Sequence, residues 1–476
     1  MRRFVLTLVA ACGLAAVPVA VPAAAQPATR PAPELTVEPH TFTATDGRTV
    51  QAELGRFRVP ENRVRPGGRT VGLAFVRFPS TNPTPGPPIV YLAGGPGGAG
   101  TDAAKGARFD LFQALRAVAD VVAFDQRGTG LSDRLPNCPH KVAVPLETPD
   151  SYAASVAAVT ETTRACAAHW RALGVDLAAY NTAESADDID ALRQALGAER
   201  VSLWAISYGT HLALATVRRH PDRVARAVLA GVEGPDDTLK LPSDQQTLLE
   251  QIDAANQAQN PGAPSFLGDF ADVLGRLRAA PVVVDVAGTA VAVSAFDVQS
   301  LAAMMLTGPD TSMLLPAMTA AMQAGDFSDV APWVIRMKAP AGIDAMSAAM
   351  DAASGASLVR RAQVASEARQ TLLGDAINFP GPVRDAALGV PDLGPAFRSP
   401  VVSDVPVLFI SGTFDGRTPV SNADRARTGF PNSAALVIEG AGHSDPLFLS
   451  TPAILERMQA FFGGQRVADE TLQMAP

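Results

Sequence analysis

Ser207 stands between a segment typical of a buried strand and a segment typical of a helix. Residues 201–206 are almost entirely apolar, and residues 208–215 continue with a helical pattern. So tight a strand-to-helix turn strains the serine and holds its hydroxyl above the sheet edge, near the helix N-terminus. The flanking positions must be small: Gly209 is, and Ala205 adds one methyl group where glycine is usual. This pattern predicts a nucleophilic serine.

A serine hydroxyl is a weak nucleophile near neutral pH and needs a base, usually a histidine oriented by a carboxylate. The chain has six histidines. His443, in Gly-Ala-Gly-His-Ser, follows a predicted strand and precedes the last predicted helix. His211 lies one turn beyond Ser207 on the same predicted helix, so its side chain should point along the helix flank. We therefore predict His443 as the base.

The acid should also follow a strand. Asp415 comes directly after the apolar strand predicted at residues 405–410, although Asp in such turns often only binds its own backbone. Glu233, which follows the preceding core strand, is the competing acid. With Asp415, the chain order is serine, acid, histidine.

The developing oxyanion of an acyl-transfer reaction requires backbone N–H donors aimed at it from roughly 3 Å. The N–H of Tyr208, directly after the predicted nucleophile, can supply one. Gly95, in the Gly-Gly-Pro-Gly run after the strand predicted at residues 89–92, can supply another, because glycines let the backbone approach closely. These two N–H groups form the predicted oxyanion hole.

The order of the elements predicts the sheet that positions these residues. Strand and turn patterns from Leu35 to Pro79 favour an antiparallel meander at a sheet edge. Short apolar strands then alternate with helices, and each strand ends in a polar or Gly-rich turn. This is the pattern of an α/β fold with a doubly wound, mainly parallel sheet, which binds ligands at the carboxyl ends of its strands.

Residues 236–400 interrupt the alternation with a largely helical, Ala-rich pattern. We predict a helical cap there, inserted between two parts of the core at residues 26–235 and 401–476. Eight of the eleven methionines lie between Met304 and Met350. They are interpreted as core residues or, alternatively, as an adaptable apolar lining of a substrate groove.

The first 25 residues have a basic start, an apolar middle and small residues at the end, which is typical of a secretory signal peptide. A lipoprotein signal ending at Cys12 is a minor alternative. No later stretch is apolar enough for a membrane span. The expected location is therefore the periplasm or the exterior of the cell.

Charge and cysteines agree with export. Removing the signal peptide changes the formal charge from -8 to -10, and an acidic chain without a basic stripe is a poor candidate for binding nucleic acid or anionic membranes. Cys138 and Cys166 are expected to form a disulfide, or to stay buried thiols. Two cysteines alone cannot complete a structural zinc site, and no cofactor is expected.

The glycine-rich loop and the segments around Ser207, Asp415 and His443 together resemble the prolyl and tripeptidyl aminopeptidase family of α/β-hydrolases. The resemblance covers residues 85–235 and 400–465 and is weak over the predicted cap. It implies a metal-independent serine exopeptidase, with Ser207, Asp415 and His443 as the triad and Gly95 and Tyr208 as oxyanion donors. The segments that carry it are residues 92–100, 125–130, 207–210, 415–419 and 442–443.

The chain departs from the family at Ala93, where prolyl aminopeptidases usually have histidine, and at Ala205. Such exopeptidases hold the free amine of the substrate with carboxylates, often from the cap. The candidates here are Glu233, Glu250 and Glu367, each of which could instead be a solvated surface charge.

Asp125 and Arg127 are expected to brace the loops below the site. The function expected is an exported serine aminopeptidase acting on short peptides, with no prediction of its oligomeric state. An esterase or amidase with the same triad is the alternative, and a non-catalytic binding protein is a more distant one.

Overall fold

The computed structural model describes residues 32–262 and 264–475. The predicted signal peptide, residues 1–25, and Cys12 lie outside the described residues. Residues from Pro33 onward form one compact unit.

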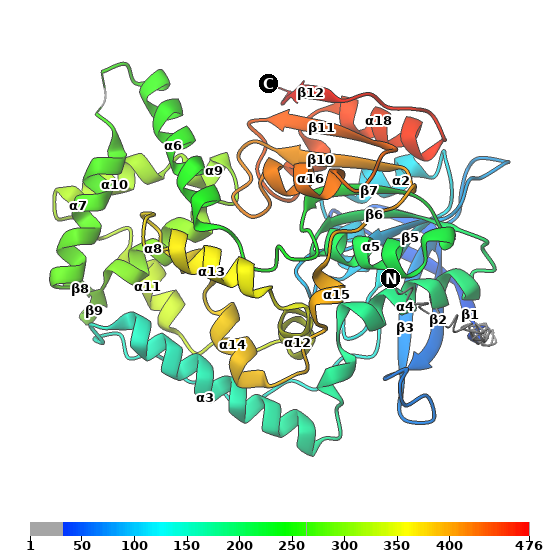
Figure 1. Cartoon of the computed structure of the whole chain (residues 1–476), viewed down its shortest axis with the longest axis horizontal. Coiled ribbons are helices and arrows are strands. Elements are labelled where there is room, and N and C mark those ends of the chain that lie inside the picture. Colours follow the sequence, from blue (N-terminus) through cyan, green and yellow to red (C-terminus); the bar gives the residue numbers. More distant parts are fainter. Residues whose placement is uncertain (1–31, 263, 476) are drawn as a thin grey trace, which may run out of the picture. The chain divides into compact units, whose positions relative to one another are not determined.

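A ten-stranded sheet forms the centre of this unit (Figure 1). Its first three strands form the predicted antiparallel meander at one edge. β3 also pairs antiparallel with β5, and from β5 to β12 the strands run parallel to one another. The predicted fold class is therefore confirmed. In sheet order the strands are β1 (Thr36–Thr43), β2 (Thr49–Pro60), β3 (Thr70–Phe78), β5 (Val121–Asp125), β4 (Ile89–Leu92), β6 (Val201–Ser207), β7 (Val224–Val232), β10 (Val407–Gly412), β11 (Ser433–Glu439) and β12 (Glu470–Gln473).

Helices cover both faces of the sheet because successive residues of its buried strands point to opposite sides. Leu203 and Ala205 of β6 belong to one hydrophobic cluster, together with α4 and α5. Trp204 and Ile206 belong to the cluster on the other face, with α1, α2 and α18. The helices flanking the sheet are α1 (Gly100–Lys105), α2 (Phe109–Leu115), α4 (Thr182–Ala195), α5 (Tyr208–Arg219), α16 (Val420–Arg427), α17 (Pro446–Leu449) and α18 (Pro452–Phe462).

The chain between β7 and β10 adds no strand to this sheet and forms a mostly helical part with a hydrophobic cluster of its own, whose buried members all lie between Leu248 and Ile377 (Figure 1). Its elements are α6 (Pro242–Gln259), α7 (Phe266–Ala279), β8 (Val282–Val286), β9 (Thr289–Val293), α8 (Ala295–Met305), α9 (Pro309–Ser312), α10 (Leu315–Gln323), α11 (Ala331–Lys338), α12 (Ala345–Ser354), α13 (Leu358–Glu367), α14 (Gly381–Leu388) and α15 (Pro395–Arg398).

Two features of this helical part differ from the helical pattern read in the sequence. It contains the antiparallel hairpin β8–β9, and the long helix α3 (Ser151–Ala172), which precedes β6 in the chain, packs against α14 and α8. In addition, Met346 and Met350 of α12 lie in the hydrophobic cluster of the sheet. The division at residues 236 and 400 stays a prediction.

The methionines of this part serve mainly as core residues. Met305 and Met322 are buried in the cluster of the helical part, and Met346 and Met350 in that of the sheet. None of the eight lines the cavity at Ser207. The interpretation as a substrate-groove lining is not supported.

Cys138 and Cys166 form the expected disulfide, which ties the segment before α3 to α3 itself. It closes a loop with a sequence separation of 28 residues. Replacing both cysteines with alanine should lower the free energy of unfolding by about 3 kcal/mol, because the open chain gains entropy when unfolded. Urea denaturation of the two proteins measures the difference. Equal midpoints and slopes would contradict the prediction.

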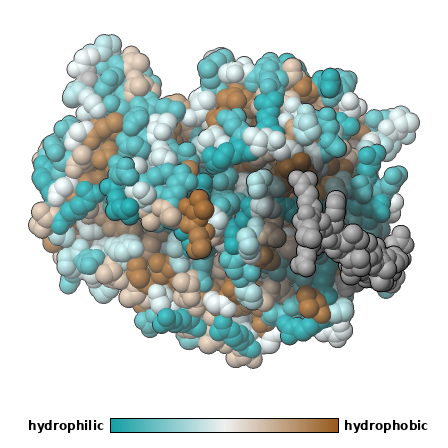
Figure 2. Space-filling view, in the orientation of Figure 1, coloured by the Kyte–Doolittle hydropathy of each residue, from teal (hydrophilic) through white to brown (hydrophobic). Residues whose placement is uncertain are grey.

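The described residues include no helix with the length and apolar character of a membrane span. On the face shown in Figure 2, hydrophobic residues lie in small separate groups among hydrophilic ones. The large buried side chains are instead concentrated around the sheet, among them Trp170, Trp204 and Phe75.

Candidate active site

Ser207 is the last residue of β6 and directly precedes α5, with φ 55° and ψ -128°. A positive φ is uncommon for a residue other than glycine and is a form of strain found at functional sites. The turn depends on the small residue that follows. A Cβ at Gly209 would lie 2.1 Å from the carbonyl oxygen of Leu92, so only glycine lets the helix pass this close to β4. Ala205 is fully buried in β6.

His443 follows β11, and its backbone N–H donates to the carbonyl oxygen of Thr307 at 2.7 Å. Its Nδ1 lies 2.8 Å from Oδ2 of Asp415, whose carboxylate is buried. The predicted acid and base are therefore in direct contact. The competing acid, Glu233, instead forms an ion pair with Lys240.

Thr418 completes the support of this pair. Its hydroxyl donates to Oδ2 of Asp415 at 2.7 Å and lies 3.1 Å from Nδ1 of His443. The other oxygen of Asp415 accepts the backbone N–H groups of Arg417 and Thr418, each at 2.8 Å. With Nδ1 donating to this fully engaged carboxylate, Nε2 of His443 is the nitrogen free to accept a proton.

Ser207 and His443 line the same cavity, which has a volume of about 850 Å³. The described residues show no hydrogen bond to Oγ of Ser207 from His443 or from any other side chain. Catalytic hydrogen bonds are often long in the absence of substrate and shorten when substrate binds. The cavity thus brings together the predicted nucleophile and base.

The glycine-rich loop after β4 borders Ser207. A Cβ at Gly94 would lie 2.9 Å from Cβ of Ser207, so glycine is needed for this approach. Gly95 has φ 121°, and its N–H has no hydrogen-bond partner among the described residues. The N–H of Tyr208 is in the first turn of α5, where the helix offers no acceptor. Gly95 lines the cavity beside Ser207, and Tyr208 directly follows Ser207 in the chain.

Asp125 and Arg127 brace the neighbouring loop, as expected. Asp125 accepts the backbone N–H groups of Thr101 and Leu131. Arg127 is fully buried and binds the carboxylate of Asp188 through two nitrogens, at 2.7 and 2.8 Å.

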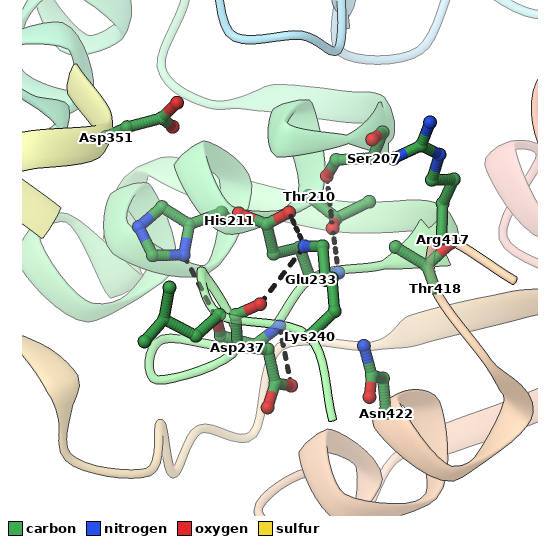
Figure 3. A network of polar contacts seen from close by, with 12 residues as sticks. Ser207, Thr210, His211, Glu233, Asp237, Lys240, Asp351, Arg417, Thr418 and Asn422 are labelled. Carbon is green, nitrogen blue, oxygen red and sulfur yellow. Dashed lines mark hydrogen bonds and ion pairs between the residues drawn. The ribbon is translucent and has the colours of Figure 1, made fainter. Parts of the chain in front are cut away.

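The three candidates for amine binding lie in different places. Glu233 lines the cavity and pairs with Lys240 at 2.5 Å (Figure 3). Glu367 accepts the backbone N–H of Ser243, and Glu250 accepts a hydrogen bond from Gln246; neither lines this cavity.

Other charged residues of the cavity were not identified from the sequence. Asp351 of α12 and Asp385 of α14 line it, and both lie within ion-pair distance of Arg384, at 2.7 and 3.5 Å. Burial raises the pKa of Asp351 to about 7 and that of Asp385 to about 6. Arg417 lines the cavity beside Thr418. No sequence motif indicates Asp351 or Asp385. Arg417, in contrast, lies within residues 415–419, one of the segments that carry the family resemblance.

His211 takes no part in the cavity. Its ring nitrogens lie 3.0 Å from the carbonyl oxygen of Gly234 and 3.2 Å from the hydroxyl of Ser354, and burial lowers its pKa. This agrees with the expectation that it points along the flank of the helix. Within the described residues, no cluster of three His, Cys, Asp or Glu side chains could hold a metal ion.

Comparison with known proteins identifies the family. A family model described as the alpha/beta hydrolase fold matches residues 87–448. Serine protease Hip1 of Mycobacterium tuberculosis is 30% identical over 231 residues, 45% of this chain and 43% of that protein. Tripeptidyl aminopeptidase of Streptomyces coelicolor is 28% identical over 195 residues, 38% of this chain and 35% of that protein. Each match thus spans less than half of the relative's length.

Among solved structures, a thermophilic esterase from Thermogutta terrifontis is 16% identical, with a TM-score of 0.36, over 85% of this chain and 97% of that one. The family model covers well over half of the sequence, including β4 through β11 and all the site residues described above. The chain therefore belongs to the α/β-hydrolase fold family.

Proposed function

We propose that this protein is a serine aminopeptidase that cleaves after one to three N-terminal residues of short peptides. The observation that carries the proposal is the contact between His443 and Asp415 at the wall of the cavity that Ser207 lines. The names of two relatives, a serine protease and a tripeptidyl aminopeptidase, support peptide bonds as the target.

In the proposed mechanism, Asp415 holds the Nδ1–H of His443, so that Nε2 accepts the proton of Ser207 as Oγ attacks the peptide carbonyl carbon. The N–H groups of Gly95 and Tyr208 bind the oxyanion. His443 then gives its proton to the leaving amine, the C–N bond breaks, and an acyl-enzyme remains. Water, deprotonated by His443, attacks this ester and releases the new carboxylate together with Ser207.

The carboxylates that line the cavity support the proposal that the protein recognises the free N-terminal amine of its substrate. Glu233 has one cationic partner, Lys240, while Asp351 and Asp385 share Arg384. The raised pKa of Asp351 reflects a buried carboxyl group with too little neighbouring positive charge. A substrate ammonium group would supply that charge, and we propose that Asp351 and Glu233 bind it.

Asp351, Arg384 and Asp385 all belong to α12 and α14, within residues 236–400. We therefore propose that this segment acts as the cap and supplies the substrate-binding side chains, while the sheet supplies the reacting ones.

The proposed location is the periplasm or the exterior of the cell. The pattern of residues 1–25 supports it, as does the disulfide between Cys138 and Cys166, because disulfides persist in oxidising compartments.

Blocking the amine tests the peptidase assignment. Acetylation of the N-terminus of a short peptide should lower kcat/KM about 100-fold, because it removes the positive charge that we propose binds Asp351 and Glu233. Steady-state kinetics on matched free and acetylated peptides measure the ratio.

The variant Asp351→Asn should lower the ratio of kcat/KM for free and acetylated peptides about tenfold, as expected for the loss of one charge-assisted contact. Asp329→Asn, an exposed position outside the cavity, is the control and should leave it unchanged. Equal rates on free and acetylated peptides, together with faster cleavage of simple esters, would support an esterase instead.

A further inference from the structure

Arg417 is a partly buried charged residue of the cavity that the proposed mechanism does not use. It lies two residues after Asp415, in the loop between β10 and α16. Its side chain extends toward Ser207 in Figure 3, and both residues line the same cavity. The backbone of this loop is fixed, since the N–H of Gly416 donates to Leu306 and the carbonyl oxygen of Gly416 accepts from Gln245.

The guanidinium of Arg417 has no partner in the part of the chain that the structure describes. It makes no hydrogen bond, no ion pair and no contact with the face of an aromatic ring. The nearby Asp415 carboxylate is already engaged by Thr418, His443 and two backbone N–H groups.

Three other cations of this cavity are paired, and a fourth, Arg134, is exposed to solvent. Arg108 binds Asp445 at 2.8 Å, Lys240 binds Glu233, and Arg384 binds Asp351. Burial lowers the pKa of Arg417, which reflects the cost of keeping this charge away from water. A guanidinium that loses water without gaining an acceptor is unfavourable, so an incoming anion would be bound strongly.

The loop that carries Arg417 sets the side of the scissile bond on which an anion would lie. Thr418, its neighbour, contacts Nδ1 of His443. In the proposed mechanism His443 donates a proton to the leaving amine, so the leaving group lies on the His443 side of Ser207. Asp351, proposed to bind the amine, lies away from Arg417, on the other side of Glu233 in Figure 3.

We propose that Arg417 binds the C-terminal carboxylate of the residue that follows the scissile bond. This inference rests on the proposed peptidase function and specifies its substrates as short peptides whose last residue is the leaving group. One residue advances the chain by about 3.8 Å, so this carboxylate stays close to the reacting carbonyl. The planar guanidinium matches a carboxylate with two parallel hydrogen bonds. Carboxylates at one end of the cavity and Arg417 at the other would thus select peptides by length.

Matched peptides with a free C-terminal carboxylate or a C-terminal amide test this assignment. Release of the last residue is followed by mass spectrometry, and kcat/KM is measured for each pair. The full-length protein should prefer the free acid about tenfold or more. Arg417→Gln should bring the ratio close to one, and Arg417→Lys should give an intermediate ratio, because ammonium keeps the charge but not the planar fork.

Arg134→Gln is the matched control. Arg134 lines the same cavity but is exposed, so this variant makes the same change in charge and should keep the full preference for the free acid. A residue that only stabilises the loop would change both rates equally and leave the acid-to-amide ratio as it was. That result for Arg417→Gln would overturn the proposal.

The results of this experiment also distinguish failure of carboxylate binding by Arg417 from failure of the proposed peptidase function. If the protein cleaves unblocked peptides but treats acids and amides alike, Arg417 does not bind the carboxylate, and the peptidase function stands. If Arg417→Gln changes the preference for an acidic residue before the scissile bond instead, the anion lies on the acyl side and the proposal is wrong. If the protein hydrolyses only esters, both proposals fail.

Discussion

Replacing Ser207 with alanine should lower kcat about 10⁶-fold while leaving the fold intact. The hydroxyl is the atom that would form the acyl-enzyme, and loss of a nucleophilic serine removes nearly all of the rate enhancement that a triad provides. Stability should hardly change, because Oγ of Ser207 has no hydrogen-bond partner among the described side chains and alanine keeps the same Cβ in the same turn. Peptide hydrolysis and thermal unfolding measure the two quantities.

Ser421→Ala is the control for this substitution. Ser421 is a partly buried serine of α16 that does not line the cavity, so its loss should leave kcat unchanged. A fluorophosphonate probe should label the wild-type protein and the Ser421 variant but not Ser207→Ala. Labelling that persists in Ser207→Ala, or activity within tenfold of wild type, would remove the proposed mechanism.

The parts of the fold that the sequence predicted well are those governed by local rules. The apolar runs at β4 and β6 have boundaries close to those expected, and the predicted last helix is present as α18. Buried strands and amphipathic helices leave a pattern along the chain. The strained turn at Ser207 was also predictable, because small neighbours are required wherever a helix passes so close to a strand.

The elements that were missed have weak local patterns. Strand β12 is mostly exposed, so it lacks an apolar run. Within β1, residues 36–40 are mostly exposed and are held by pairing with β2 rather than by burial. The hairpin β8–β9 is short and interrupts a helical segment.

Asp351 and Asp385 of the cavity could not be found from the sequence for a different reason. An aspartate on an Ala-rich helix has the same sequence pattern whether it faces solvent or a cavity. Asp351 lies partly buried at the cavity, and Met346 and Met350 on the same helix belong to the hydrophobic cluster on one face of the sheet. Such packing joins segments far apart in the chain, and no spacing of residues within α12 indicates it.

Asp415→Asn should lower kcat about 10⁴-fold, the second-largest effect expected, while the fold and the hydroxyl of Ser207 remain. The carboxylate accepts the Nδ1–H of His443 at 2.8 Å and so leaves Nε2 unprotonated toward the cavity. An amide in its place can present its NH₂ group to Nδ1, which then becomes the acceptor and leaves the proton on Nε2. The histidine would be in the wrong tautomer to act as a base, and the charge that stabilises its protonated form would be lost.

The kinetics would distinguish a role of Asp415 in orienting His443 from a role in binding the substrate. If Asp415 orients His443, KM should change little while kcat falls. Asp424→Asn, at an exposed position of α16, is the matched control and should have wild-type kinetics. Thr418→Val should give a smaller loss than Asp415→Asn, since it removes one hydrogen bond to Oδ2 of Asp415 but keeps the carboxylate. If Asp415→Asn retains kcat within tenfold while Glu233→Gln abolishes it, the acid is Glu233, and the contact between Asp415 and His443 does not act in catalysis.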